Sequence, residues 1–320
     1  MELQYTLQVA ATDTPRRIDV YLSTRLRKFS RNKIQTRIHR QAVLVNDKPV
    51  QPDYLVSPGD IICIYNEHKE FTEPVTPEDI PLDIVFEDEY LIVINKPGGM
   101  PVHKGLGNYR GTLLNALAFH FNKSNSMCKA EEGMIHRLDS GTSGLIVFSK
   151  NKASRISLEK QLKNHQIRRE YVALVYGTPK SGSGVIDVPV GKDPDQPKVI
   201  RAFPDRDGGK EAVTYYAVEE NLNLATLVGC RLETGRTHQI RIHMQFAGHA
   251  LLGDTRYPPS KLLQAVSKIL EEEGVERHLL HAGRLMFTHP VSGETCVFEA
   301  PMPDDMMRVY RRLKERIQNL

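Results

Sequence analysis

The segment Ile135–Leu145 places one carboxylate beside an arginine and a histidine. Asp139 follows His136 and Arg137, and the apolar run 146–148 comes directly after the segment. Such a run is typical of a buried strand, so we expect Asp139 at the rim of a hydrophobic core. A charge in that position is costly unless it is paired or takes part in chemistry. An isolated Asp would be interpreted as a hydrogen-bonded loop end, but the surrounding residues make Asp139 a candidate catalytic carboxylate.

Two later segments hold an aromatic side chain and a second arginine. Tyr171 begins the apolar strand of segment 169–175, where the sequence alone favours core packing. The segment 232–244 ends a strand, turns at a glycine and opens a helix, and Arg241 lies in that helix between two isoleucines. Those isoleucines favour a partly buried arginine over a surface one. A further segment, 80–97, contains a buried strand that ends in Asn-Lys-Pro.

In their order along the chain, the four segments resemble those of the RluA-type pseudouridine synthases, which isomerise uridine in RNA. The likeness covers nearly the whole chain and is nearest to the synthases of large-subunit ribosomal RNA. The resemblance implies an α+β catalytic domain with a mixed, largely antiparallel sheet. It also implies an isomerase that needs no cofactor. The reaction breaks a nitrogen–carbon glycosidic bond, rotates the uracil and makes a carbon–carbon bond, and nothing is oxidised or lost.

The resemblance also implies roles for single residues. Asp139 matches the catalytic aspartate, Tyr171 matches the tyrosine that stacks on the target base, and Arg241 matches the basic residue that pairs with the aspartate. Arg137 matches the arginine that replaces the flipped nucleotide in the RNA helix, and His136 is expected to contact the RNA. Base extrusion costs roughly a few kcal/mol, so a filler and a stacking partner are physically required. The sequence leaves open whether the carboxylate attacks the sugar, attacks the base or promotes elimination.

The histidines and glycines do not indicate a bound metal or nucleotide. His238 and His243 are five residues apart, so they do not share a helical face as ligands four residues apart would. The glycines after Lys96 lack the spacing of a dinucleotide-binding loop. We therefore expect no metal and no cofactor, and we interpret the histidines as structural or RNA-contacting.

Basic residues gather near the N-terminus. From Arg16 to Lys48, ten Lys or Arg residues stand against two acids. Helical spacing predicts two helices there, the second at 31–40 with Ser30 as its N-cap. Short strands follow, and the arrangement resembles the ribosomal-protein-type RNA-binding module, a small α/β unit expected over residues 1–66. The polar face of the second helix is expected to offer three side chains to phosphates, namely Arg31, Lys33 and Arg37.

The remainder of the chain is expected to form an acidic linker over 67–81 and the catalytic domain over 82–320. Strands and helices alternate there without a strict βαβ rhythm, which favours an α+β fold. Strands are predicted at the start of 91–99 and at 145–148, 171–176, 213–218 and 225–232, and helices at 112–121, 153–164, 237–247, 261–273 and 305–317. The stretch 258–278 is expected to hold a helix that covers the core, the alternative being a substrate-contacting insertion.

Size and composition suit a two-domain protein that meets RNA. The 320 residues are 40% hydrophobic, and the net charge of +4 is small. No apolar run approaches the roughly 20 residues of a membrane span, and the N-terminus lacks a signal-peptide pattern. The four cysteines form no Cys-x-x-Cys pair, which argues against a disulfide framework or a zinc site. We expect a reduced, cytoplasmic monomer whose partner is RNA and not a membrane.

The sequence thus predicts isomerisation of specific uridines in structured RNA, most simply large-subunit ribosomal RNA, with transfer RNA as the alternative substrate. Two other classes of protein fit the sequence less well. A different glycosidic-bond-cleaving enzyme would need a second carboxylate, for which Glu233 could be argued. A non-catalytic RNA-binding or ribosome-assembly factor would have no reason to keep a buried carboxylate beside a tyrosine and an arginine.

Overall fold

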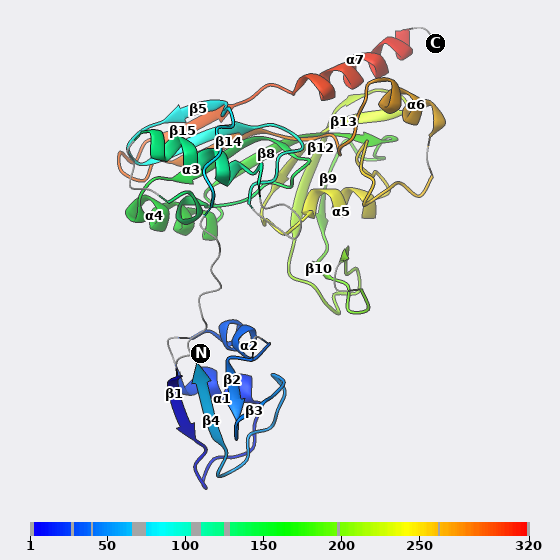
Figure 1. Ribbon diagram of the computed structural model, residues 1–320. Helices are drawn as coiled ribbons and strands as arrows, with labels where there is room; N and C mark the ends of the chain where they lie inside the picture. Colours follow the sequence, from blue (N-terminus) through cyan, green and yellow to red (C-terminus); the bar gives the residue numbers. More distant parts are fainter. Residues whose placement is uncertain are drawn as a thin grey trace. The chain divides into compact units, whose positions relative to one another are not determined.

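The computed structural model describes residues 3–26, 29–39, 41–65, 75–103, 110–124, 129–196, 199–261 and 263–318. The chain forms two compact units, Met1–Pro74 and Val75–Leu320, each with its own hydrophobic core (Figure 1). In the described residues, no helix is long and apolar enough to cross a membrane.

The larger unit begins earlier than the sequence predicts. The backbone of Val75 and the carbonyl of Thr76 hydrogen-bond to side chains of Glu131 and Asn115, at 3.1 and 2.7 Å. Residues 75–81 therefore belong to the larger unit and not to a linker, because backbone groups that are paired with a domain are ordered by it. The remainder of the predicted linker, 67–74, lies outside the described residues.

The smaller unit packs two helices against a four-stranded antiparallel sheet. Its elements are β1 (Leu3–Gln8), α1 (Ile18–Arg25), α2 (Arg31–His39), β2 (Val43–Val45), β3 (Lys48–Pro49) and β4 (Ile61–Tyr65), with strand order β1-β4-β2-β3. Ser30 caps α2 as predicted, because its Oγ accepts from the backbone N–H of Lys33 at 3.3 Å. The apolar faces of both helices supply Ile18, Leu22, Ile34 and Ile38 to the core. Arg40, the predicted last residue of the second helix, lies outside the described residues.

The larger unit is built on a nine-stranded mixed sheet, largely antiparallel, which confirms the predicted α+β class. The strand order is β5-β6-β7-β14-β8-β13-β12-β9, with β15 paired to β14. The strands are β5 (Ile84–Glu87), β6 (Leu91–Lys96), β7 (Ser143–Ser149), β8 (Arg168–Tyr176), β9 (Ser183–Asp187), β12 (Val213–Asn221), β13 (Ala225–Leu232), β14 (Leu280–Thr288) and β15 (Thr295–Glu299). Only β7 and β14 pair in parallel among the described strands. A separate hairpin joins β10 (Val190–Lys192) to β11 (Ile200–Ala202).

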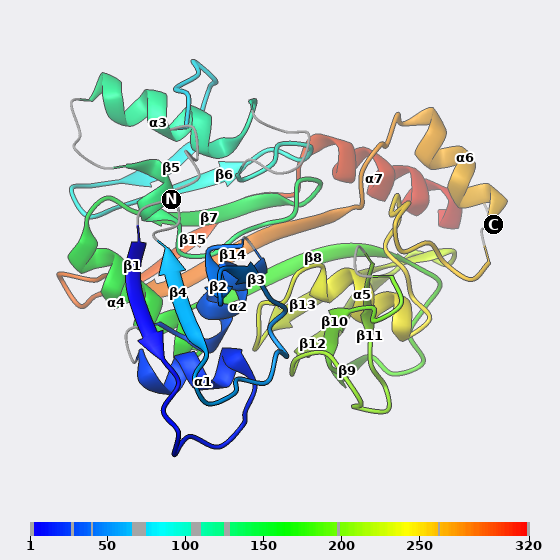
Figure 2. The same cartoon turned by 60° about the horizontal axis from the view of Figure 1, so that its bottom comes forward.

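Helices cover both faces of this sheet. They are α3 (Leu113–Lys123), α4 (Lys152–Lys163), α5 (Gln239–Phe246), α6 (Gln264–Glu272) and α7 (Asp304–Gln318). The sheet separates two cores, and strand β8 contributes to both because its alternate residues point to opposite faces. Tyr171 and Ala173 share a core with α3 and α5, whereas Leu174 lies in the core under α6 and α7, which run side by side (Figure 2). Helix α6 covers the core, as expected for the stretch 258–278.

The central strand β14 was not predicted from the sequence. Its hydrophobic pattern is interrupted by His281, Gly283 and Arg284, so the pattern predicts neither a strand nor a helix. The fold nevertheless provides hydrogen-bond partners for the buried His281. Its ring bonds to Ser143 Oγ at 3.0 Å and to the Ala300 carbonyl at 3.1 Å. Strand β14 joins β7 to β8 and thereby brings the loop before β7 close to the start of β8.

Candidate active site

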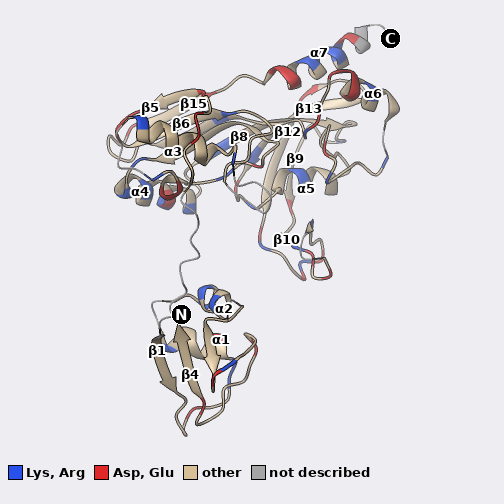
Figure 3. Ribbon diagram, in the orientation of Figure 1, with Lys and Arg blue, Asp and Glu red and all other residues tan. Residues whose placement is uncertain are grey.

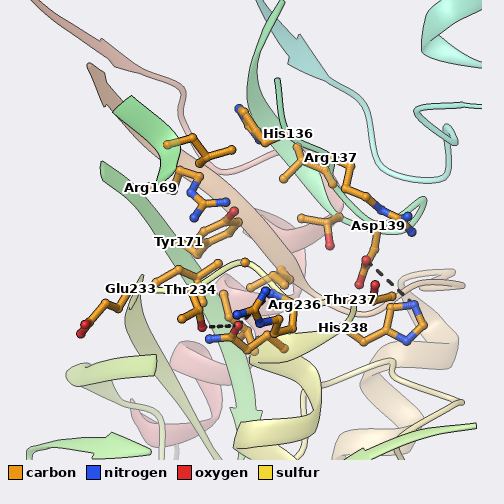
Figure 4. Close-up of a pocket in the computed structure, with 18 of the residues that line it drawn as sticks. His136, Arg137, Asp139, Arg169, Tyr171, Glu233, Thr234, Arg236, Thr237 and His238 are labelled. Carbon is orange, nitrogen blue, oxygen red and sulfur yellow. Dashed lines mark hydrogen bonds and ion pairs between the residues drawn. The ribbon is translucent and has the colours of Figure 1, made fainter. Parts of the chain in front are cut away.

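Asp139 lies in the loop that leads into β7. Every residue of β7 is buried, so the end of the loop is anchored in the core. The loop turns tightly, with the Thr142 N–H donating to the Asp139 carbonyl at 3.1 Å. The side chain of Asp139 remains 15% exposed and points into a pocket of about 570 Å³ (Figure 4). It also lines a second hollow of about 620 Å³, so it stands between two open spaces.

A buried lysine holds the Asp139 loop through hydrogen bonds to backbone carbonyls. Lys96 is 1% exposed, and its ammonium donates to the carbonyls of Pro97, Met100 and Ser140 at 2.8, 2.9 and 3.1 Å. Burial lowers the pKa of Lys96 to about 7; repulsion by Arg277 adds to this, and attraction by Asp139 opposes it. The lysine thus connects the end of β6 to the residue that follows Asp139.

A second support comes from the C-terminal helix. Arg277 donates to the Gly141 carbonyl at 2.8 Å and pairs with both carboxylate oxygens of Asp305, at the start of α7, at 2.6 and 2.8 Å. A fork of this kind fixes the direction of the guanidinium. The position of the Asp139 loop therefore depends on an element more than 150 residues further along the chain.

Arg241 connects Asp139 to a second carboxylate, which the sequence did not reveal. Its Nη1 donates to Asp139 Oδ2 at 3.2 Å, while Nε and Nη2 donate to Asp254 at 2.7 and 2.9 Å. Burial raises the pKa of Asp254, but the hydrogen bonds and charge of Arg241, the backbone hydrogen bond from Tyr257 and the charge of His278 together outweigh it and leave the pKa below its usual value. The predicted pair with Asp139 is therefore present, within a three-membered ionic group in which Arg241 and Asp254 are buried and Asp139 is partly exposed.

The loop after α5 completes this group. Asp254 Oδ1 also accepts from the backbone N–H groups of Arg256 and Tyr257, both at 3.0 Å. The Tyr257 hydroxyl bonds to Nδ1 of His238 at 2.9 Å, and Nε2 of His238 lies 3.9 Å from Asp139 Oδ1. His238 has φ of 58°, a left-handed backbone at the start of α5. The turn directs its ring toward Asp139, as Figure 4 shows.

Tyr171 lies on the wall of the same pocket. It projects from β8, is 5% exposed, and burial raises the pKa of its phenol, so the ring is neutral. The structure thus brings Asp139, Tyr171 and Arg241 together, although they are far apart in the chain. Arg137 is exposed and lines both hollows, a position consistent with its predicted contact to RNA.

The histidines have mainly structural contacts. His136 lines the pocket but is 7% exposed, and burial lowers its pKa to about 3, so it brings no positive charge to RNA. His243 is fully enclosed, with its ring bonded to Thr214 Oγ1 and to the Val188 carbonyl, both at 2.9 Å. Across the residues that the structure describes, no group of three or more His, Cys, Asp or Glu side chains is placed to hold a metal ion.

The three basic residues predicted for helix α2 differ in their availability. Figure 3 shows basic residues along α2. Lys33 and Arg31 are both exposed, but the Arg31 guanidinium donates to Asp19 at 2.9 and 3.0 Å. Arg37 is 7% exposed, donates to Gln4 Oε1 at 2.8 Å and lies 4.3 Å from the centre of the Phe29 ring. The prediction that Arg37 is available to phosphates is therefore wrong. Its aliphatic stem and planar head suit packing against an aromatic ring.

Comparison with known proteins identifies both units. The family described as RNA pseudouridylate synthase matches residues 90–246, and the S4 domain matches residues 16–62. An RNA pseudouridine synthase of Chlorobaculum parvum, itself uncharacterized, is 41% identical over 97% of this chain and 97% of its own length. The Vibrio cholerae protein named ribosomal large subunit pseudouridine synthase D is 36% identical over 98% and 96% of the two chains.

A solved structure has the same architecture. Human RNA pseudouridylate synthase domain containing 4 matches with a TM-score of 0.58 and 25% identity, over 72% of this chain and 92% of that one. The resemblance seen in the sequence is therefore confirmed in both sequence and fold. The chain belongs to the RNA pseudouridylate synthase family and joins an S4 domain to the synthase domain.

Proposed function

We propose that this enzyme converts specific uridines of large-subunit ribosomal RNA to pseudouridine, with Asp139 as the catalytic carboxylate. One observation carries the proposal: Asp139, Tyr171 and Arg241, from three separate segments, line a single pocket around one ionic group. The choice of ribosomal RNA is supported by relatives that are named for the ribosomal large subunit, such as the Vibrio cholerae protein and one from Neisseria meningitidis serogroup B, 40% identical over 93% of this chain and 79% of its own length.

The reaction needs a catalytic group beside the glycosidic bond and space for the base to rotate. The bond from N1 of uracil to C1′ of the ribose breaks, the uracil turns, and a bond forms from C5 to C1′. The proton on C5 leaves, and N1 takes up a proton, so atoms and charge balance. We propose that Asp139 acts in the first step, which is supported by its carboxylate facing the open pocket and accepting a hydrogen bond from Arg241 at 3.2 Å.

Arg241 supplies the counter-charge that directs the carboxylate. Its guanidinium lies at hydrogen-bond distance from Asp139 Oδ2, and a charge-assisted hydrogen bond of this kind fixes the geometry of both groups. Asp254 holds the other side of the guanidinium through two nitrogens, so the group does not have to rearrange when substrate enters. Fixed dipoles and charges of this kind are more effective than mobile water in a buried site.

Tyr171 and Arg137 are proposed to handle the extruded nucleotide. The neutral ring of Tyr171 lies on the pocket wall, where it can stack on the uracil face. Arg137 lies at the border of the two hollows with its side chain exposed, where it can fill the place the base leaves. The S4 unit is proposed to add RNA affinity through its exposed basic residues, Lys33 among them.

The test is site-by-site mapping of pseudouridine in ribosomal and transfer RNA, from cells with and without the gene. We expect one or a few large-subunit positions to lose the modification. An unchanged map of ribosomal RNA with a lost site in transfer RNA would retain the isomerase and reject the proposed substrate. An unchanged map of both would contradict the function.

A further inference from the structure

The pocket contains a second buried arginine that the proposed mechanism does not use. Arg169 precedes Tyr171 by two residues on β8, so both side chains lie on the same face of the sheet. It is 8% exposed and lines the pocket. Its buried Nε has no hydrogen-bond partner, and within the described part of the chain no carboxylate lies at ion-pair distance from its guanidinium.

The acids of the pocket do not compensate this charge. Asp139 is held by Arg241, and Glu233 accepts the hydroxyl hydrogen bond of Tyr215 at 2.6 Å. An arginine cannot avoid the cost of burial by losing its proton, because arginine side chains stay protonated in proteins. Burying an unpaired charge is costly, so a group that arrives with a negative charge would gain more here than at an exposed arginine.

The surroundings keep the guanidinium in place. It lies beside the Tyr171 ring, as Figure 4 shows, and against the backbone of Gly235. A Cβ at Gly235 would stand only 2.8 Å from Nη1 of Arg169, so the glycine leaves the room that the guanidinium occupies. Nearby His136 is neutral at physiological pH because burial, and then repulsion by Arg169, lower its pKa. Arg169 is therefore a fixed, isolated cation at the pocket wall.

We propose that Arg169 binds a phosphate of the RNA backbone next to the extruded uridine. The inference rests on the proposed function, because that function supplies the RNA. A phosphodiester carries a full negative charge and presents two oxygens that match the planar fork of a guanidinium. A uracil carbonyl carries only a partial charge and would leave most of the positive charge uncompensated. With Tyr171 on the base and Arg169 on the phosphate, one strand of the sheet would hold both parts of the nucleotide.

The test measures affinity for a large-subunit ribosomal RNA transcript as a function of salt. Arg169→Met removes the charge and Arg169→Lys keeps it without the fork. Arg168→Met is the matched control, because Arg168 is the exposed neighbour on the opposite face of the same strand. Each phosphate contact contributes roughly 0.7–0.9 to the slope of log affinity against log salt. We expect Arg169→Met to lower the slope by that amount, which is roughly a five- to eightfold loss of affinity at 0.1 M salt.

Thermal melting separates this role from a structural one. Removing an unpaired buried charge does not destabilise the fold, so we expect Arg169→Met to melt at or above the temperature of the parent. A much lower melting temperature would overturn the proposal, since it would reveal a structural partner. A slope equal to that of Arg168→Met would also overturn it. Weaker binding with an unchanged slope would assign Arg169 to the base edge instead of a phosphate. If the parent binds RNA but forms no pseudouridine, the proposed function fails while the phosphate contact can still be measured.

Discussion

Arg241 gives two of its nitrogens to Asp254 and only one to Asp139. The distances from Nε and Nη2 to Asp254 are 2.7 and 2.9 Å, against 3.2 Å from Nη1 to Asp139. Because the guanidinium is planar, the two bonds to Asp254 fix the direction of the third nitrogen. Asp254 is therefore a positioning residue for the pair on which the proposed chemistry depends.

Replacing Asp254 should slow the reaction more than it weakens RNA binding. In Asp254→Asn one oxygen of the fork becomes an amide donor, so Arg241 loses its fixed orientation. We expect single-turnover rates to fall about 10- to 100-fold, with the dissociation constant for RNA nearly unchanged. The exposed residue Asp195 provides the control Asp195→Asn, which should match the parent. A normal rate for Asp254→Asn would show that Arg241 holds its place without it.

Removing Arg241 should reverse the pH dependence of stability near the pKa of Asp254. In the parent this pKa is lowered, so the pair contributes stability that is present above the unfolded pKa and is lost as pH falls through the folded pKa. In Arg241→Met burial, the largest effect, raises the pKa of Asp254 and is opposed only by the backbone hydrogen bond from Tyr257 and the charge of His278. We expect a loss of roughly 3–5 kcal/mol at neutral pH, part of which returns as pH falls and Asp254 takes up a proton.

Thermal melts over a pH series test this expectation, and activity is measured alongside. Arg241→Met should be nearly inactive at neutral pH, and Arg241→Lys should lie between it and the parent, because a lysine lacks the planar fork. If Arg241→Met is as active as the parent, Arg241 is not the functional partner of Asp139.

Lys96 should make the protein more stable as pH rises above neutrality. Its folded pKa of about 7 lies below the ordinary value of 10.5, so between these limits the unfolded state binds more protons than the folded state. Stability therefore increases with pH across that window. Lys96→Met should remove this slope and also lower stability, because a buried carbonyl left without a donor costs about 1–3 kcal/mol. Lys152→Met, at an exposed lysine, is the control for charge loss. Identical slopes in parent and Lys96→Met would contradict the assignment.

The S4 unit should contribute to RNA affinity through exposed rather than buried basic residues. Lys33→Gln should reduce the slope of log affinity against log salt by roughly 0.7–0.9, with no change in the melting temperature. Deleting residues 1–74 should lower the slope further and leave the synthase unit folded, because the two units have separate cores. An unchanged slope in both proteins would mean that this basic surface is only solvated.

Much of the fold and the centre of the site could be predicted from the sequence. The strand at 145–148 and the helix behind Ser30 follow from local periodicity and capping, which are properties of neighbouring residues. Asp139, Tyr171 and Arg241 were found because each lies in a recognisable segment, and the structure places them in one pocket.

The residues that sequence reasoning missed depend on contacts between distant segments. Asp254 follows a glycine in a loop, and nothing in its neighbourhood indicates that it faces Arg241. Arg169 and Lys96 have long polar side chains that are usually exposed, and only the tertiary structure shows that they are buried. Arg37 shows the opposite error, since its place on a polar helix face predicted exposure, whereas the ring of Phe29 and the side chain of Gln4 enclose it.

The substitution Asp139→Asn tests the central claim most directly. The amide keeps the shape of the carboxylate and can still accept from Arg241, but it cannot act as the nucleophilic or proton-accepting group. The measurement is tritium release from uracil C5 in large-subunit ribosomal RNA, with Asp205→Asn, at an exposed aspartate, as the control. We predict no detectable release by Asp139→Asn, RNA affinity within a few-fold of the parent, and normal activity of the control. Release within a few-fold of the parent would contradict the assignment of Asp139 as the catalytic carboxylate.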